Sequence, residues 1–83
     1  MERRIGKITH FYTHLCVAVL ELEDELRAGD EIHILGHITD FTQLVDSLEI
    51  EHKKVISAGV GVEVALKVED YVRVGDEVFK ITT

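Results

Sequence analysis

The same turn occurs twice in the sequence, and this repeat limits the folds open to the chain more than any other feature. The tripeptide Gly-Asp-Glu stands at residues 29–31 and again at residues 75–77, and at the same offset Arg27 matches Arg73. Glycine takes positive φ at low cost and aspartate bonds nearby backbone amides, so each copy predicts a reversal between two strands. The predicted turn residues are Gly29, Asp30, Gly75 and Asp76. Two such units predict a barrel or sandwich with approximate internal symmetry, and two ordinary hairpins that merely look alike are the alternative.

Several segments have the composition of β-strands. The stretch from Leu15 to Glu23 is apolar and β-branched at successive positions, which predicts a strand buried on both sides for much of its length. The region from Thr42 to Ile56 fits helical and strand spacing about equally well. Further strands are predicted at Arg4–His10, Glu31–Leu35, Val62–Val68 and Glu77–Ile81. With 83 residues there is room for one core, so residues 1–83 are predicted to form a single domain.

The charge balance restricts the class of ligand. Nine Lys and Arg against sixteen Asp and Glu give a net charge of −7, which repels nucleic acid phosphates. A narrow contact with one nucleotide or one acceptor end stays open, through local cations such as Lys53 and Lys54. No apolar run approaches the roughly 20 residues of a membrane helix, the charged start predicts no signal peptide, and the one cysteine suits a reducing compartment. We therefore expect a cytoplasmic protein with no membrane contact.

The motifs of several enzyme and cofactor classes are missing. There is no Gly-x-x-x-x-Gly-Lys loop for GTP and no third glycine beside Gly59 and Gly61 for a dinucleotide. Cys16 is predicted to lie in the middle of an apolar strand, where a thiolate is disfavoured. Pairs of acidic residues at 23–24 and 69–70 are typical of solvated loops, and the five histidines are typical of strand ends more than of a zinc site. We expect no catalysis, no metal and no cofactor.

The order of elements from Gly29 to Ile81 resembles the second domain of translation elongation factors of the Tu type. The resemblance is carried by the segments Ala28–Ile32, Gly36–Asp40, Val45–Glu49, Ala58–Gly61, Val64–Leu66 and Val72–Val78. It also extends to small stand-alone elongation-factor-like proteins and to the barrel at the C-terminus of collagenase-like peptidases. The chain departs from the elongation-factor pattern at Ala65, where glycine is usual, and at Lys67, where an apolar residue is usual.

This resemblance implies a six-stranded closed barrel of Greek-key type, with residues 42–52 forming one strand. It implies a non-catalytic binding module that contacts a tRNA or RNA end or a partner in the translation machinery, with Glu49 in the ligand pocket. The other expected ligand-binding residues are Lys53, Lys54 and Lys67. The alternative is an accessory protein-interaction barrel that acts with a larger protein partner, a peptidase or an RNA-modifying enzyme.

Overall fold

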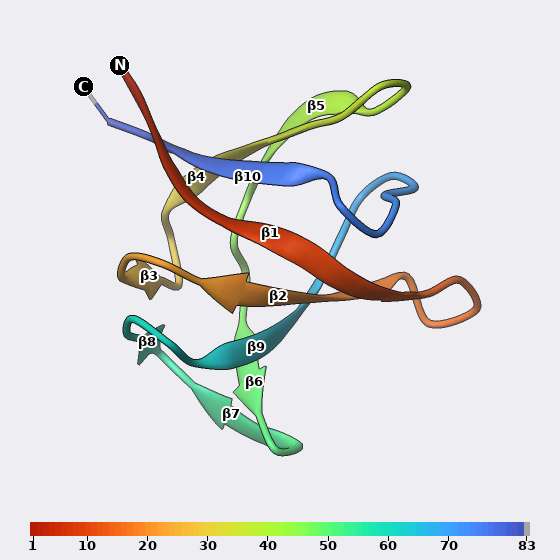
Figure 1. Ribbon diagram of the computed structural model, residues 1–83. Coiled ribbons are helices and arrows are strands. Elements are labelled where there is room, and N and C mark those ends of the chain that lie inside the picture. Colours follow the sequence, from red (N-terminus) through yellow and green to blue (C-terminus); the bar gives the residue numbers. More distant parts are fainter. Residues whose placement is uncertain (83) are drawn as a thin grey trace.

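The computed structural model describes residues 1–82, and this part of the chain consists of strands and turns without a helix. The strands are β1 (Glu2–Tyr12), β2 (Val17–Leu22), β3 (Leu26–Arg27), β4 (Glu31–Leu35), β5 (Asp40–Leu44), β6 (Leu48–Ile50), β7 (Lys53–Val55), β8 (Ser57–Ala58), β9 (Glu63–Lys67) and β10 (Glu77–Ile81). The longest, β1, crosses the middle of the molecule between β10 and β2 (Figure 1). The predicted all-β class is confirmed.

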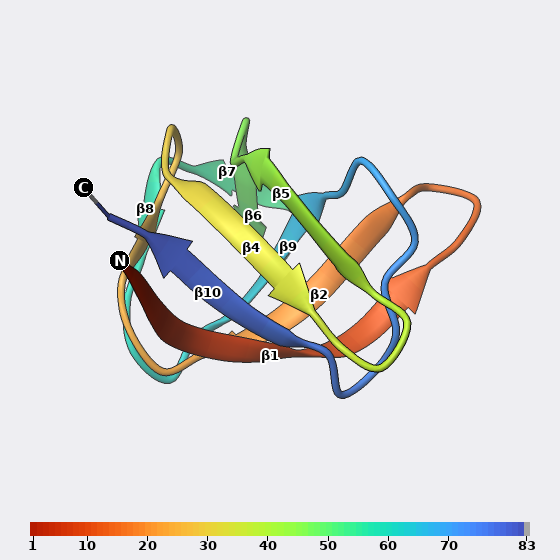
Figure 2. The same cartoon turned by 90° about the horizontal axis from the view of Figure 1, so that it is seen from above.

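Eight of these strands form one antiparallel sheet in the order β5-β4-β10-β1-β2-β9-β6-β7, and β3 pairs separately with β8. The sheet curves around a common interior (Figure 2). Its ladders leave β5 and β7 at the two ends, so within residues 1–82 backbone pairing does not close a ring. The predicted closed barrel is thus not confirmed. The described residues form ten strands where six were predicted, because short strands such as β3 and β8 are counted separately.

The interior is filled by one face of each main strand. Alternate residues of β2 and β9 point inward, and Leu20 and Val64, which lie directly opposite each other, are each 1% exposed. Ile5 of β1, Ile34 of β4 and Leu48 of β6 are buried in the same core. Alternation of this kind is the pattern that places one face of a strand against a core and the other at the surface.

A single strand at residues 42–52 is wrong, because the chain bends at Val45 between β5 and β6. The amide of Val45 donates to Asp30 O at 2.8 Å, and its carbonyl accepts from the Gly29 amide at 2.7 Å. The Val45 side chain is 2% exposed. Backbone bonding to the first Gly-Asp turn and burial of this valine end β5, and β6 restarts at Leu48.

The two Gly-Asp turns have the same geometry, as the repeat predicts. Gly29 and Gly75 both have a φ of 96°. Asp30 Oδ2 accepts the Arg27 amide at 2.9 Å, and Asp76 Oδ2 accepts the Arg73 amide at 2.8 Å. The second turn pairs with Ile8 of β1 as the first pairs with Val45. Positive φ at both glycines and the aspartate bonds to backbone amides agree with the repeat, and in each turn the backbone bonds one partner residue, Val45 or Ile8.

We expect Asp76→Ala to destabilise the fold more than Asp30→Ala. Asp76 is 5% exposed, so its loss leaves the Arg73 amide without a partner in a site that water hardly reaches, at a cost of about 2 kcal/mol. Asp30 is only half-buried, so water replaces its bond to the Arg27 amide more easily. Urea unfolding of both variants measures the difference, and equal losses would contradict the assigned role of burial.

His33 connects three strands across the outer face of the sheet. From β4 its Nδ1 lies 2.9 Å from Glu2 Oε1 in β1, and its Nε2 lies 2.6 Å from Asp40 Oδ1 in β5. Hydrogen bonds to the carboxylate of Glu2, and then to that of Asp40, raise the pKa of His33 above its usual 6.5 against the opposing effect of burial. The charged form of His33 is therefore favoured in the folded protein.

This raised pKa predicts that the protein loses stability as the solution becomes alkaline. The stabilisation from His33 is complete below the unfolded-state pKa of 6.5 and is lost as the pH rises through the higher folded-state value. Urea unfolding at a series of pH values from below 6.5 into the alkaline range measures this fall. His33→Gln is the control, and a His33→Gln protein with the same pH profile as the parent would contradict the assignment.

Candidate functional site

An uncovered apolar surface lies on the outside of the sheet, where β2, β9 and β6 are neighbours. The outward-facing residues of β2 include Val17 and Val19, which are half-buried because no other layer covers them. With Ile50, Val62 and Ala65 they line a groove with an open volume of about 720 Å³.

The strand register places the groove floor in a row across the sheet. Val19 lies directly opposite Ala65, and Ala65 lies directly opposite Glu49. Side chains at opposed positions of neighbouring strands point to the same face. Two apolar residues and the half-buried carboxylate of Glu49 therefore share one surface.

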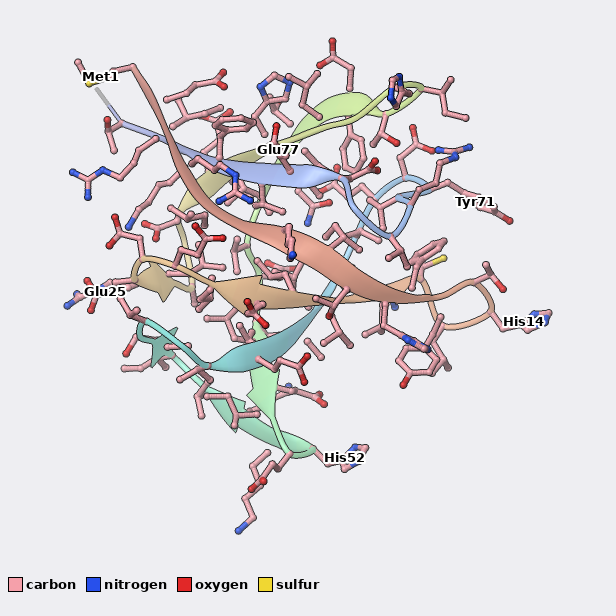
Figure 3. The ribbon with its side chains drawn as sticks, in the orientation of Figure 1. Met1, His14, Glu25, His52, Tyr71 and Glu77 are labelled. Atoms are coloured by element: carbon pink, nitrogen blue, oxygen red, sulfur yellow. The ribbon has the colours of Figure 1, made fainter. Side chains whose placement is uncertain are left out.

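Two projecting turns flank this floor. The β1–β2 hairpin contributes Tyr12 and Leu15, and the β6–β7 turn contributes Glu51 and His52. His14 and His52 mark the tips of these two projections in Figure 3. The ring of Tyr12 contacts that of His10 with centroids 4.6 Å apart and an interplanar angle of 46°, which supports the hairpin wall of the groove.

The non-glycine residues with positive φ within residues 1–82 all lie in these two turns. Cys16 has a φ of 54° in the hairpin, and Glu51 and His52 have φ values of 51° and 68°. Side chains other than glycine reach this conformation at a cost, because Cβ approaches the backbone. The sequence thus holds both walls of the groove in conformations that local preference disfavours.

The groove lining is acidic at its rim. Glu51 and Glu63 stand at the surface, Glu49 lies in the row of floor residues, and the lining contains no Lys or Arg. None of the three carboxylates belongs to an ion pair within residues 1–82. The groove lining therefore combines an apolar floor with three carboxylates and no cation, while Lys54 lies opposite Glu49 in the β6–β7 ladder, outside the lining.

The structure separates the four predicted ligand-binding residues. Glu49 lines the groove, and Lys67 lines a smaller hollow of about 140 Å³ beside it, which also includes Glu49. Lys54 lines a different hollow, of about 540 Å³, with Ala28 and Ile56. Lys53 is exposed on the edge strand β7. A shared site for all four stays a prediction. Glu49 shares the smaller hollow with Lys67 and lies directly opposite Lys54 in the β6–β7 ladder, whereas Lys53 lies opposite Ile50.

The position predicted for Cys16 is wrong. Cys16 lies in the turn between β1 and β2, where its Sγ donates to Thr13 O at 3.7 Å. β1 continues to Tyr12, past its predicted end at His10, and β2 begins at Val17, after its predicted start at Leu15. Residues 13–16 therefore form the turn. Within residues 1–82 no three His, Cys, Asp or Glu side chains are arranged to hold a metal ion.

Sequence reasoning missed most of the groove. Its missed residues are Tyr12, Leu15, Val17, Val19, Ile50, Glu51, His52, Val62, Glu63 and Val64. The signal was present in β2, which is apolar on both faces. We interpreted that pattern as burial on both sides, whereas one face of β2 is the floor of an open groove.

Comparison with known proteins supports the peptidase part of the resemblance. The chain is 40% identical over 76 residues to an uncharacterised protease of Methanocaldococcus jannaschii, a match that covers 90% of this chain and 19% of that protein. The chain thus spans about a fifth of the length of this curated relative. No protein-family model matches the chain.

Two crystal structures share the fold. Both are of the C-terminal domain of a Geobacillus thermoleovorans protein described as a U32 peptidase. One has a TM-score of 0.87 at 20% identity and covers 92% of this chain and 96% of that chain. The other has a TM-score of 0.88 at 21% identity and covers 94% and 91%. These names support the accessory-barrel alternative and give no support to the translation-factor interpretation.

Residues 1–82 were compared with what a membrane-spanning helix requires. This part of the chain has no helix with the length and apolar character that a bilayer crossing requires.

Proposed function

We propose that this chain is a non-catalytic accessory domain that holds a polypeptide segment for a peptidase. The observation that carries the proposal is the uncovered apolar floor of Val17, Val19 and Ala65 between two projecting turns. An apolar sheet face without a covering layer is costly to expose to water, and in soluble proteins contiguous apolar patches mark interaction sites. The protease name of the 40% identical relative supports a role beside a peptidase.

The accessory domain would act as a curved sheet in which a side chain links the end strand β5 to β9. Gln43 of β5 donates to Lys67 O at 2.9 Å and accepts from the Glu69 amide at 2.8 Å, at the end of β9. This bridge would hold the floor strand β9 in place while the groove is filled. The proposal thus includes the barrel of the resemblance as a curved sheet whose end strand β5 is tied to β9 by a side-chain amide.

The charge of the groove favours polypeptide over RNA. Three carboxylates and no Lys or Arg line it, so a phosphate backbone would meet repulsion there. A peptide carries no obligatory negative charge. We therefore propose the peptidase-associated alternative in place of the contact with a tRNA or RNA end.

Titration with a library of short synthetic peptides, followed by amide NMR shifts, tests the proposal. We expect shifts concentrated at Val17, Val19, Glu49 and Ala65, with no hydrolysis of the peptides by the purified chain. Val19→Thr keeps the branched shape but makes the floor polar. It should weaken the binding of all peptides about fivefold, because about 1 kcal/mol of apolar contact is lost. Absence of shifts in the groove, or cleavage of the peptides, would overturn the proposal.

A further inference from the structure

We propose that the groove selects an extended segment in which an apolar side chain is followed, two or three residues away, by Lys or Arg. This inference rests on the proposed function and adds the chemical class of the segment. The apolar side chain would lie on Val17 and Val19, and the cation would lie beside Glu49.

Charge complementarity carries the first half of this inference. Glu49, Glu51 and Glu63 line the groove and form no ion pair among the described residues. Lys54, opposite Glu49 in the β6–β7 ladder, and Lys67, in the neighbouring hollow, lie outside the groove lining. Several other carboxylates are ion-paired; Arg4, for example, pairs with both Glu23 and Glu77. A half-buried carboxylate such as Glu49 is screened by salt less than an exposed one. A bound cation would meet unneutralised charge here.

The strand spacing carries the second half. Val19 and Glu49 are separated by β9, so two strand spacings, about 10 Å, lie between them. An extended peptide advances about 3.3 Å per residue, so three residues cover this span, and two suffice when a long basic side chain reaches forward. The apolar and basic positions are therefore close in sequence.

Other occupants fit the groove less well. A phosphate-bearing ligand would be repelled, and a neutral apolar segment would cover Glu49 without giving its charge a partner. A second copy of this chain carries a net charge of −7 and would bring further repulsion. A basic and apolar polypeptide segment satisfies both features of the lining.

Three capped peptides with one leucine on a Gly-Ser background test the inference. They carry Lys, Gln or Glu three residues after the leucine, and NMR titration gives the affinity of each. We expect the Lys peptide to bind about fivefold more tightly than the Gln peptide, as one favourable charge pair implies. The Glu peptide should bind more weakly still, and added salt should reduce the preference for Lys.

Two variants separate charge selection from peptide binding. Glu49→Gln should bring the Lys peptide to within about twofold of the Gln peptide, whereas Glu31→Gln, the same change on exposed β4 outside the groove, should leave the preference intact. Equal affinity of the three peptides would overturn the inference and leave the proposed function standing. If no peptide changes the NMR shifts of the groove residues, the proposed function fails and this inference fails with it.

Discussion

Gly6→Ala is expected to remove much of the stability of the fold. A Cβ at residue 6 would overlap the backbone carbonyl of Glu21 in β2, well inside the 3.0 Å that real contacts respect. Backbone cannot rotate away as a side chain can, so β1 and β2 must separate, at a cost of about 3 kcal/mol. A domain of this size has about 4–12 kcal/mol in total, so the loss is a large fraction. Thermal and urea unfolding measure it.

Gly59→Ala is the matched control for this substitution. A Cβ at Gly59 meets no atom within 4 Å, and its φ is not in the left-handed region. We expect the control to change stability by less than about 1 kcal/mol. Similar losses of stability in the two variants would show that the close approach of β1 to β2 at Gly6 is not the reason why residue 6 must be glycine.

The turns were the most predictable part of the fold, because their chemistry is local. Positive φ at Gly29 and Gly75 and the aspartate bonds to nearby amides depend on residues within one turn. The bend at Val45 was not predictable, because it depends on bonding to Asp30, which approaches only in the folded chain. Strand ends decided by such distant partners leave no pattern in the local sequence.

Only one residue of the groove floor, Glu49, was predicted from the sequence to bind a ligand. Glu49 came from a resemblance, while Val17 and Val19 were assigned to a buried interior. An apolar strand face looks the same in sequence whether a second layer covers it or not. Whether a cover exists depends on the whole arrangement of strands, so the groove could be recognised only in the structure.

Gln43→Leu is expected to destabilise the protein by about 3 kcal/mol, because it leaves two backbone groups without partners. Gln43 is 6% exposed, and its amide bonds both Lys67 O and the Glu69 amide. Leucine keeps the volume but can satisfy neither group. Urea unfolding gives the loss, and faster hydrogen exchange at the Glu69 amide locates it.

The outcome also tests the link between this bridge and the groove. Lys67 ends β9, the strand that supplies Ala65 to the groove floor, so a loosened end of β9 should weaken peptide binding as well as stability. Thr42→Ala, on the exposed face of the same strand, is the control and should change stability by less than about 0.5 kcal/mol. A Gln43→Leu protein with unchanged stability and unchanged exchange at Glu69 would show that β5 and β9 are held together by core packing, without need of the side-chain bridge.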